Sequence, residues 1–180
     1  MINGLYKYDS KELNNILSKF TIIVDSREKS HQHVLNFFIK QNIPFISHKL
    51  EVGDYSCYLK KDEDLGILRD TYLPICIERK NSLEELAQSF SDRNRFEEEF
   101  IRAERYGYKV PLLVEEALGY QKLISGNYQS KYNSKAFLGS LKAFEARYGF
   151  STIFIDKNYT GHYLYYSLLY QAREVVLHGR

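Results

Sequence analysis

Apolar positions recur along the chain with two different periods, and together they predict an alternation of helices and strands. The spacing of Leu13, Ile16, Leu17 and Phe20 is typical of an amphipathic helix, and the β-branched run 21–24 is typical of a buried strand. The predicted helices span residues 10–20, 31–41, 82–105, 134–147 and 161–178. The predicted strands span residues 21–24, 45–59, 73–77, 109–114 and 151–155.

The order of these elements predicts the fold class. In the segment 45–59, apolar residues alternate with polar ones, but Val52 is at an even position and Tyr55 at an odd one. The alternation therefore changes phase at Gly53-Asp54, where we expect a bulge or a bend. The later alternation of strands and helices favours parallel strands, whereas two consecutive central strands favour one antiparallel pair. We therefore predict an α/β fold with a mixed central sheet flanked by helices.

Composition is that of an ordinary globular domain. The 180 residues are 44% apolar, with only 10 Gly and 3 Pro, which excludes disordered and collagenous chains. No apolar run approaches the roughly 20 residues of a membrane helix, and the first residues lack the apolar segment of a secretory signal. Cys57 and Cys76 are too few for a disulfide framework. We predict a single domain over 1–180 in a cytoplasmic setting.

Charge is distributed unevenly although its net value is only +2. Residues 120–180 contain 8 Lys or Arg but 3 Asp or Glu, so the first part of the chain is acidic and the last part basic. This asymmetry suits a metal site beside a surface that binds a polyanion. The alternative is that these charges are scattered without function.

Three acidic residues each end or interrupt an apolar strand, namely Asp25, Asp54 and Glu78. A carboxylate beside buried residues is costly unless it is compensated, and a hard divalent cation with oxygen ligands is one form of compensation. Because strand side chains alternate, Glu78 and Lys80 share one face and Arg79 points to the other.

Carboxylates and a lysine on one face suit phosphodiester hydrolysis. The carboxylates would hold a metal ion, and the lysine would orient water or stabilise charge on the phosphate. Each piece alone has an ordinary alternative, because Glu78–Lys80 also suits an exposed charge cluster, residues 53–55 a turn, and Asp25–Glu28 a helix cap with a local ion pair.

Three segments together resemble the nuclease domain of the XPF-type structure-specific endonucleases, which include XPF, archaeal Hef and the Mus family. The segments are Val24-Asp25-Ser26-Arg27-Glu28, Val52-Gly53-Asp54-Tyr55 and Ile77-Glu78-Arg79-Lys80. The resemblance covers about residues 20–175. It implies a restriction-endonuclease-like fold and cleavage of branched DNA with Mg²⁺ or Mn²⁺.

The resemblance also implies roles for individual residues. Asp54, Glu78 and Asp25 would be metal ligands, Lys80 would be the catalytic lysine, and Glu28 would shape the positions of metal and water. Arg79 would support catalysis, and Arg27 and Arg95 would bind DNA.

The chain departs from the family pattern at two points. Glu84 stands where the family usually has Asp, four residues after the lysine. No tandem helix-hairpin-helix module is expected, because the nuclease core spans about 20–178 and residues 1–20 form a helical extension. The compact form resembles a standalone bacterial or phage nuclease, with repair, recombination or phage DNA processing as its setting.

Basic and aromatic residues near the carboxyl end suggest two surfaces. Basic residues interleaved with tyrosines would track a DNA backbone, with Lys131 and Lys135 foremost, and Arg93 and Arg95 would contact DNA nearer the active site. The other basic residues of this surface are Lys122, Lys142 and Arg147. A second, tyrosine-rich surface on the last helix suggests a homodimer face. Its residues are Tyr163, Tyr165, Tyr166 and Tyr170. The alternatives are a solvated basic face and tyrosines divided between core and water.

Three functional hypotheses follow. The first is a magnesium-dependent DNA endonuclease with Asp54, Glu78 and Lys80 at its centre. The second is a DNA-binding or scaffold module without catalysis, which the intact motifs disfavour. The third is a sequence-specific restriction-type endonuclease of the same fold.

Overall fold

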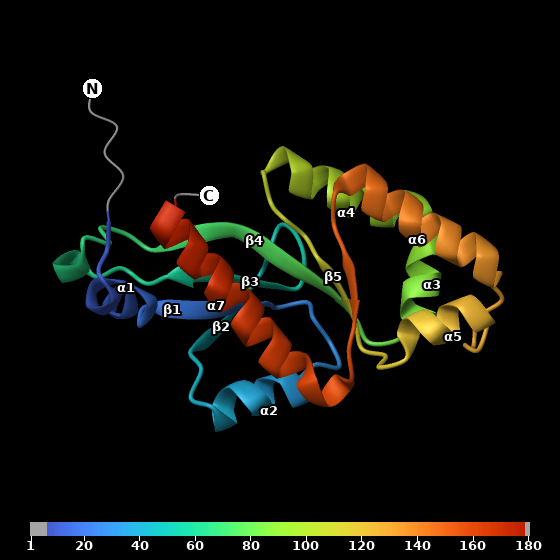
Figure 1. Cartoon of the computed structure of the whole chain (residues 1–180), viewed down its shortest axis with the longest axis horizontal. Coiled ribbons are helices and arrows are strands. Elements are labelled where there is room, and N and C mark those ends of the chain that lie inside the picture. Colours follow the sequence, from blue (N-terminus) through green and yellow to red (C-terminus); the bar gives the residue numbers. More distant parts are fainter. Residues whose placement is uncertain (1–6, 179–180) are drawn as a thin grey trace.

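The computed structural model describes residues 7–178, in which a six-stranded mixed sheet lies between two groups of helices (Figure 1). The strands are β1 (Phe20–Asp25), β2 (Phe45–His48), β3 (Tyr55–Leu59), β4 (Thr71–Lys80), β5 (Leu112–Val114) and β6 (Thr152–Phe154). The helices are α1 (Ser10–Leu17), α2 (Gln32–Lys40), α3 (Leu83–Ser91), α4 (Arg93–Arg105), α5 (Gly119–Ser125), α6 (Ser134–Tyr148) and α7 (Thr160–His178). Two short 3₁₀ helices are η1 (Glu63–Leu65) and η2 (Lys157–Tyr159).

The sheet has the strand order β2-β1-β3-β4-β5-β6. β3 and β4 are antiparallel, as predicted for the two central strands, and β1 and β3 form a second antiparallel pair. The outer pairs β1–β2, β4–β5 and β5–β6 are parallel. The predicted mixed sheet flanked by helices is therefore confirmed.

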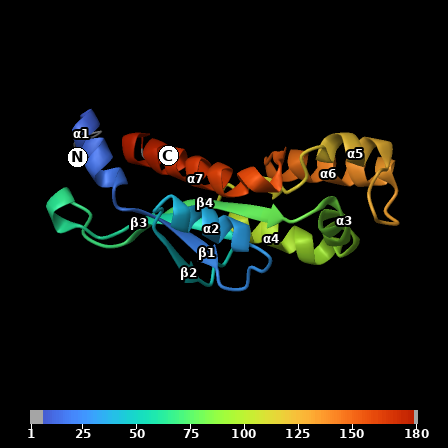
Figure 2. The same cartoon turned by 90° about the horizontal axis from the view of Figure 1, so that it is seen from below.

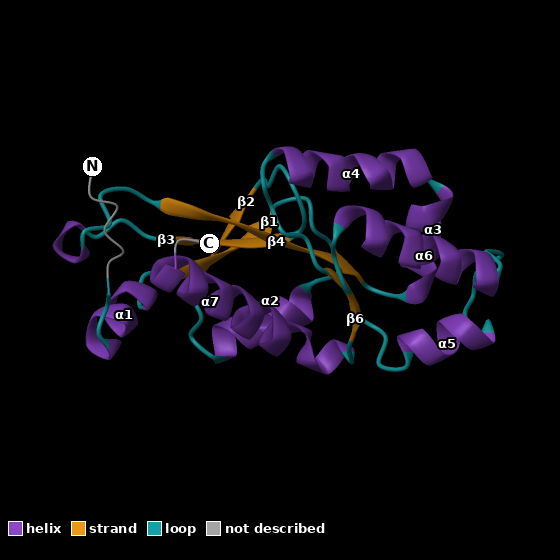
Figure 3. Cartoon of the chain, turned by 45° about the horizontal axis from the view of Figure 1, so that its top comes forward, coloured by secondary structure: helices purple, strands orange, loops and turns teal. Residues whose placement is uncertain are grey.

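The two faces of the sheet carry separate apolar cores. Figure 3 shows α1, α2 and α7 on one side of the strands and α3, α4 and α6 on the other. Because side chains alternate along β4, Ile75 and Ile77 pack into the core under α7, whereas Cys76 packs with Phe90 and Phe144 on the opposite face. The carboxyl end of β4 leads directly into α3, so residues 78–80 lie where strand and helix meet (Figure 2).

The prediction of one interrupted strand over 45–59 is wrong. β2 and β3 lie on opposite sides of β1, parallel and antiparallel to it respectively. The connection turns at Gly53, whose φ is +68°, so the predicted change of phase is a change of strand rather than a bulge.

Two other predictions need correction. The helix expected over 82–105 is two helices, because Asp92 has a non-helical backbone with ψ of 56° between α3 and α4. The strand expected from residue 109 begins at Leu112, since Pro111 lacks an N–H and Lys109 forms only an isolated bridge to Ile75. The helix α5 was not predicted.

The predicted amino-terminal helix over 10–20 is α1, which ends at Leu17 and packs against α7 through the same core as β1. Residues 1–6 of the predicted extension, and 179–180 of the predicted domain, lie outside the described residues. No helix within 7–178 has the length and apolar character needed to cross a bilayer.

Gly53 is required by both its backbone conformation and its surroundings. Its φ of +68° is costly for any residue with a Cβ, and a Cβ built there would lie 2.9 Å from Cys76 Cβ. Gly66 has a similar φ of +74°, but nothing lies within 4 Å of its Cβ position. The two glycines therefore separate backbone strain from steric overlap.

We expect Gly53→Ala to lower the free energy of unfolding more than Gly66→Ala. Both changes would cost about 1–2 kcal/mol from the left-handed backbone, and the overlap with β4 would add roughly 1–3 kcal/mol at Gly53. Urea denaturation of both variants measures the difference. Equal losses would show that the turn at Gly53 can move away from β4.

Candidate active site

Asp54 and Glu78 lie on the same face of the sheet. Tyr55 pairs with Ile77 in the antiparallel register. Asp54, which precedes Tyr55, therefore stands opposite Glu78, which follows Ile77. The Asp54 backbone N–H donates to Ile77 O at 3.0 Å, and Asp54 Oδ2 accepts from Arg79 N at 2.8 Å. Burial, together with the charges of Glu78 and Glu28, raises the pKa of Asp54 well above its ordinary value.

Lys80 follows on the same face, as the alternation along β4 predicts. Its Nζ donates to Glu78 Oε1 at 2.6 Å and lies 5.1 Å from the centre of the Phe96 ring. Burial alone would lower the pKa of Lys80, but the Glu78 carboxylate outweighs it and raises that pKa above its ordinary value. Lys80 is therefore a buried cation beside Glu78, whose carboxylate favours its protonated form.

Glu99 on α4 is a fourth member of this cluster that sequence reasoning missed. Burial, and next the charge of Glu78, raise its pKa to about 7. Glu99 therefore lies close enough to Glu78 for the two carboxyls to interact. The signal available in the sequence was the spacing of Phe96, Glu99, Phe100 and Ala103, which places Glu99 beside the buried stripe of the helix.

Arg79 points to the opposite face, as predicted, and is held between two carboxylates. Its Nη2 lies 2.5 Å from Glu28 Oε1, and its Nη1 lies 2.8 Å from Glu115 Oε2. Glu115 Oε1 in turn contacts His33 Nε2 at 2.6 Å. Burial raises the pKa of Glu28, and Arg79 opposes that rise. His33 and Glu115 were absent from the predicted site, and this network joins β4, β5, α2 and the segment after β1.

Asp25 is held by hydrogen bonds to Arg27 and Leu50. Its Oδ1 accepts from the backbone N–H and Nε–H of Arg27, and its Oδ2 accepts from Arg27 Nη2 and from Leu50 N. Burial alone would raise the pKa of Asp25, but these hydrogen bonds leave it below its ordinary value. The assignment of Asp25 as a metal ligand stays a prediction, while its contacts and those of Arg27 fix the loop beside Asp54.

The donor set on the Glu78 face fits a divalent cation in chemistry. Asp54, Glu78 and Glu99 supply carboxylate oxygens, Lys80 is the buried cation that binds Glu78, and Glu99 Oε2 is buried without a hydrogen-bond partner. Within 7–178, however, no three Asp, Glu, His or Cys side chains are arranged as a coordination shell. A bound cation would therefore require these side chains to rotate.

A polar cleft of ≈270 Å³ opens onto Lys80 and Glu99 between α3 and α4. Its other lining residues are Glu85, Gln88, Ser89, Asp92, Arg95 and Phe96. Arg95 is exposed at this cleft and lies 3.5 Å from Asp92, whereas the Arg93 guanidinium lies over the Phe144 ring. The structure therefore brings Arg95, but not Arg93, to the cleft that contains Lys80.

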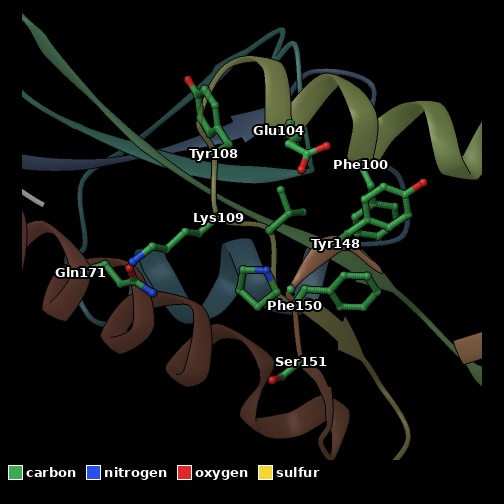
Figure 4. Close-up of a pocket in the computed structure, with 12 residues that line it drawn as sticks. Phe100, Glu104, Tyr108, Lys109, Tyr148, Phe150, Ser151 and Gln171 are labelled. Carbon is green, nitrogen blue, oxygen red and sulfur yellow. The ribbon is translucent and has the colours of Figure 1, made fainter. Parts of the chain in front are cut away.

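A separate pocket of ≈330 Å³ contains none of the predicted site residues. Figure 4 shows Phe100, Tyr148 and Phe150 on one side of it, with Lys109 and Gln171 on another. Phe100 and Val110 line both this pocket and the narrow space beside Glu78 and Glu99. This pocket and the acidic cluster therefore lie on two sides of the same residues.

The predicted basic surface divides into paired and unpaired residues. Three of its members are bound to carboxylates, in the pairs Lys122–Glu116, Lys142–Glu145 and Arg147–Glu97. Lys131 and Lys135 are exposed and enter no ion pair within the described part of the chain. Glu84 Oε1 accepts from Gln129 N at 2.8 Å, so Glu84 anchors the loop that carries Lys131 to the start of α3.

Comparisons with known proteins agree with this geometry. The family model described as the ERCC4 domain matches residues 24–167. The structure of XPF from Aeropyrum pernix is similar with a TM-score of 0.60 and 22% identity, covering 86% of this chain and 66% of that one. The same protein in complex with DNA gives 0.59 and 22%, covering 86% and 65%. The chain thus spans just under two thirds of these relatives, and the predicted restriction-endonuclease-like fold is confirmed. No curated protein matches.

The buried network around Arg79 predicts a large effect of Glu115→Gln on stability. Glu115 has a fully buried side chain that faces both Arg79 and His33. Removing its charge leaves Arg79 less compensated, and we expect a loss on the order of 3 kcal/mol in the free energy of unfolding.

Glu63→Gln is the matched control, because the Lys61–Glu63 pair is exposed and exposed pairs contribute little. Urea denaturation compares the two variants. Similar small losses in both would contradict a structural role for the Arg79 network.

Proposed function

This chain belongs to the ERCC4 domain family, and on that premise we propose that it is a metal-dependent DNA endonuclease that hydrolyses phosphodiester bonds. The observation that carries the proposal is the meeting of Asp54, Glu78 and Lys80 on one face of the sheet. A similar structure, XPF from Aeropyrum pernix, is in complex with DNA, which supports DNA as the substrate.

Mg²⁺ or Mn²⁺ would be held by Asp54 and Glu78. When bound, such a cation offsets charge on the phosphate and lowers the pKa of a coordinated water. Asp54 is positioned for this by two backbone hydrogen bonds with β4, which leave its Oδ1 available. The raised pKa of Asp54 reflects its burial and next the negative charges of Glu78 and Glu28, and a divalent cation would offset both effects.

Lys80 would act on the phosphate or the attacking water. Its ammonium is buried, protonated and restrained by Phe96, so it presents a fixed positive charge. Such a charge stabilises the negative charge that develops on the phosphoryl oxygens during hydrolysis. Arg79 would support the reaction indirectly, because it fixes β4 from the opposite face through Glu28 and Glu115.

DNA would approach across the cleft between α3 and α4. Arg95 lies at this cleft, and the loop with Lys131 is anchored by Glu84 to the start of α3, directly after Lys80 in the chain. Unpaired lysines bind phosphates by releasing counterions, whereas lysines already bound to carboxylates gain less. Lys131 and Lys135 are thus the best candidates on this surface for backbone contacts.

Branched or otherwise structured DNA is the proposed substrate, with repair, recombination or phage DNA processing as the setting. The XPF-type resemblance supports this choice. We also propose a homodimer through α7, where Tyr166 and Tyr170 are exposed while Tyr163 and Tyr165 pack against the core. Cleavage of labelled forks, flaps, junctions and plain duplex, with and without Mg²⁺, tests the substrate class. Discrete bands from a random plasmid would favour a restriction-type enzyme instead.

Glu78→Gln and Lys80→Ala should retain DNA binding and lose cleavage by at least about 100-fold. The reason is that one removes a proposed metal ligand and the other the fixed charge on the phosphate. Cleavage of a preferred labelled substrate and a separate binding titration measure the two properties, with Glu63→Gln as the control. Full activity of both variants at saturating Mg²⁺ would refute the site assignment, and binding without cleavage by the unaltered chain would favour a scaffold module.

Lys131→Ala combined with Lys135→Ala should weaken binding to all DNA sequences and reduce the salt dependence of the affinity. Each lost phosphate contact lowers the slope of log affinity against log salt by about 0.9. Lys11→Ala combined with Lys40→Ala is the matched control, since both lysines are exposed and lie on α1 and α2. An unchanged slope in the first double variant would exclude this surface from the DNA path.

A further inference from the structure

An aromatic ring from α4 lies over the ammonium of Lys80. Lys80 Nζ is 5.1 Å from the centre of the Phe96 ring, and both residues line the polar cleft between α3 and α4. The face of an aromatic ring is negatively polarised and attracts a cation, most strongly where water is excluded. The Lys80 side chain is 10% exposed, so this contact is largely desolvated.

The Phe96 ring is itself held by other rings. It stacks on Phe144 at a centroid distance of 5.8 Å, and it lies edge to face with Phe90 at 5.3 Å and with Phe100 at 5.1 Å. All four rings are buried. A ring packed in this way cannot turn from Lys80 without repacking the core. It therefore presents a fixed surface to a flexible side chain.

Lys80 needs such a restraint because the cleft contains competing carboxylates. Its Nζ donates to Glu78 Oε1 at 2.6 Å. The same cleft is lined by Glu85, Asp92 and Glu99, any of which would draw a mobile ammonium away from that place. The ring attracts the charge as a whole through its quadrupole. N–H donors of the ammonium thus stay available for a phosphoryl oxygen or the attacking water.

We propose that Phe96 is a positioning residue for phosphodiester hydrolysis, in which the face of its ring holds the Lys80 ammonium in place for the reaction. This inference rests on the proposed function, because it concerns the work of Lys80 in that reaction. Since Phe96 acts through the lysine, weakening its attraction for the ammonium should lower the rate of cleavage at saturating DNA and leave DNA binding unchanged.

The test replaces Phe96 in the full chain by phenylalanine with one, two or three fluorine atoms on the ring, introduced by nonsense suppression. Fluorine withdraws negative charge from the ring face and changes the size of the ring little, so the attraction for a cation falls stepwise. We expect kcat for a preferred labelled DNA at saturating Mg²⁺ to fall with each fluorine, reaching about tenfold for the trifluorinated ring. KM should stay within about twofold.

Phe90 is the matched control. It is 3% exposed, as Phe96 is, and it packs against Phe96 and Phe144 in the same cluster. Among the described residues, no cation lies over its ring. The same fluorine series at Phe90 should leave kcat within about twofold, and urea denaturation of both series measures any change in stability.

Three results would overturn the inference. They are a kcat that does not respond to fluorine at Phe96, equal losses of kcat in the Phe96 and Phe90 series, and a rise in KM in place of a fall in kcat. Phe96→Leu is a second measurement, because it keeps an apolar side chain and removes the ring. A folded Phe96→Leu variant with full kcat would also overturn the inference, and if that variant does not fold, the fluorinated series decides alone.

The proposed function fails separately from this inference. A chain that cleaves no DNA at saturating Mg²⁺ refutes both. A chain whose cleavage depends on Lys80 but does not respond to fluorine at Phe96 refutes only the role of Phe96.

Discussion

The antiparallel register between β3 and β4 is the constraint on which the candidate site depends. Pairing of Tyr55 with Ile77 places Asp54 opposite Glu78 and fixes Asp54 by hydrogen bonds to the backbone of β4. A slip by one residue would turn every side chain of the strand to the other face and separate the two carboxylates. Gly53 maintains this register, because its positive φ and missing Cβ allow the turn to lie against Cys76.

The buried charges on the two faces of β4 are compensated to different extents. On one face, Arg79 is compensated by Glu28 and Glu115, so the network is closed within the protein. On the other face, Lys80 is the one buried cation, within the described residues, that meets Asp54, Glu78 and Glu99. The first face can therefore act as a rigid support, while on the second face the carboxylates outnumber the buried cation.

The features that could be predicted from the sequence are those that follow from the alternation of side chains along a strand. The alternation along residues 75–80 was sufficient to place Glu78 and Lys80 on one face and Arg79 on the other. The separation of 45–59 into two strands was not predictable in this way, because β2 pairs in parallel with β1 and this pairing is non-local. The break at Asp92 depends on packing too, since it lets Phe90 and Phe96 both surround Phe144.

Glu99 shows most clearly why a site is harder to predict than the sheet that carries it. In the sequence it is the last of three consecutive glutamates, a pattern typical of an exposed helix face. Only the packing of Phe96 and Phe100 determines which of the three meets the sheet. A strand positions its charges by its own alternation, whereas a helix positions them by the core beneath it. The carboxylates on the strands could therefore be found from spacing, and the carboxylate on α4 required the structure.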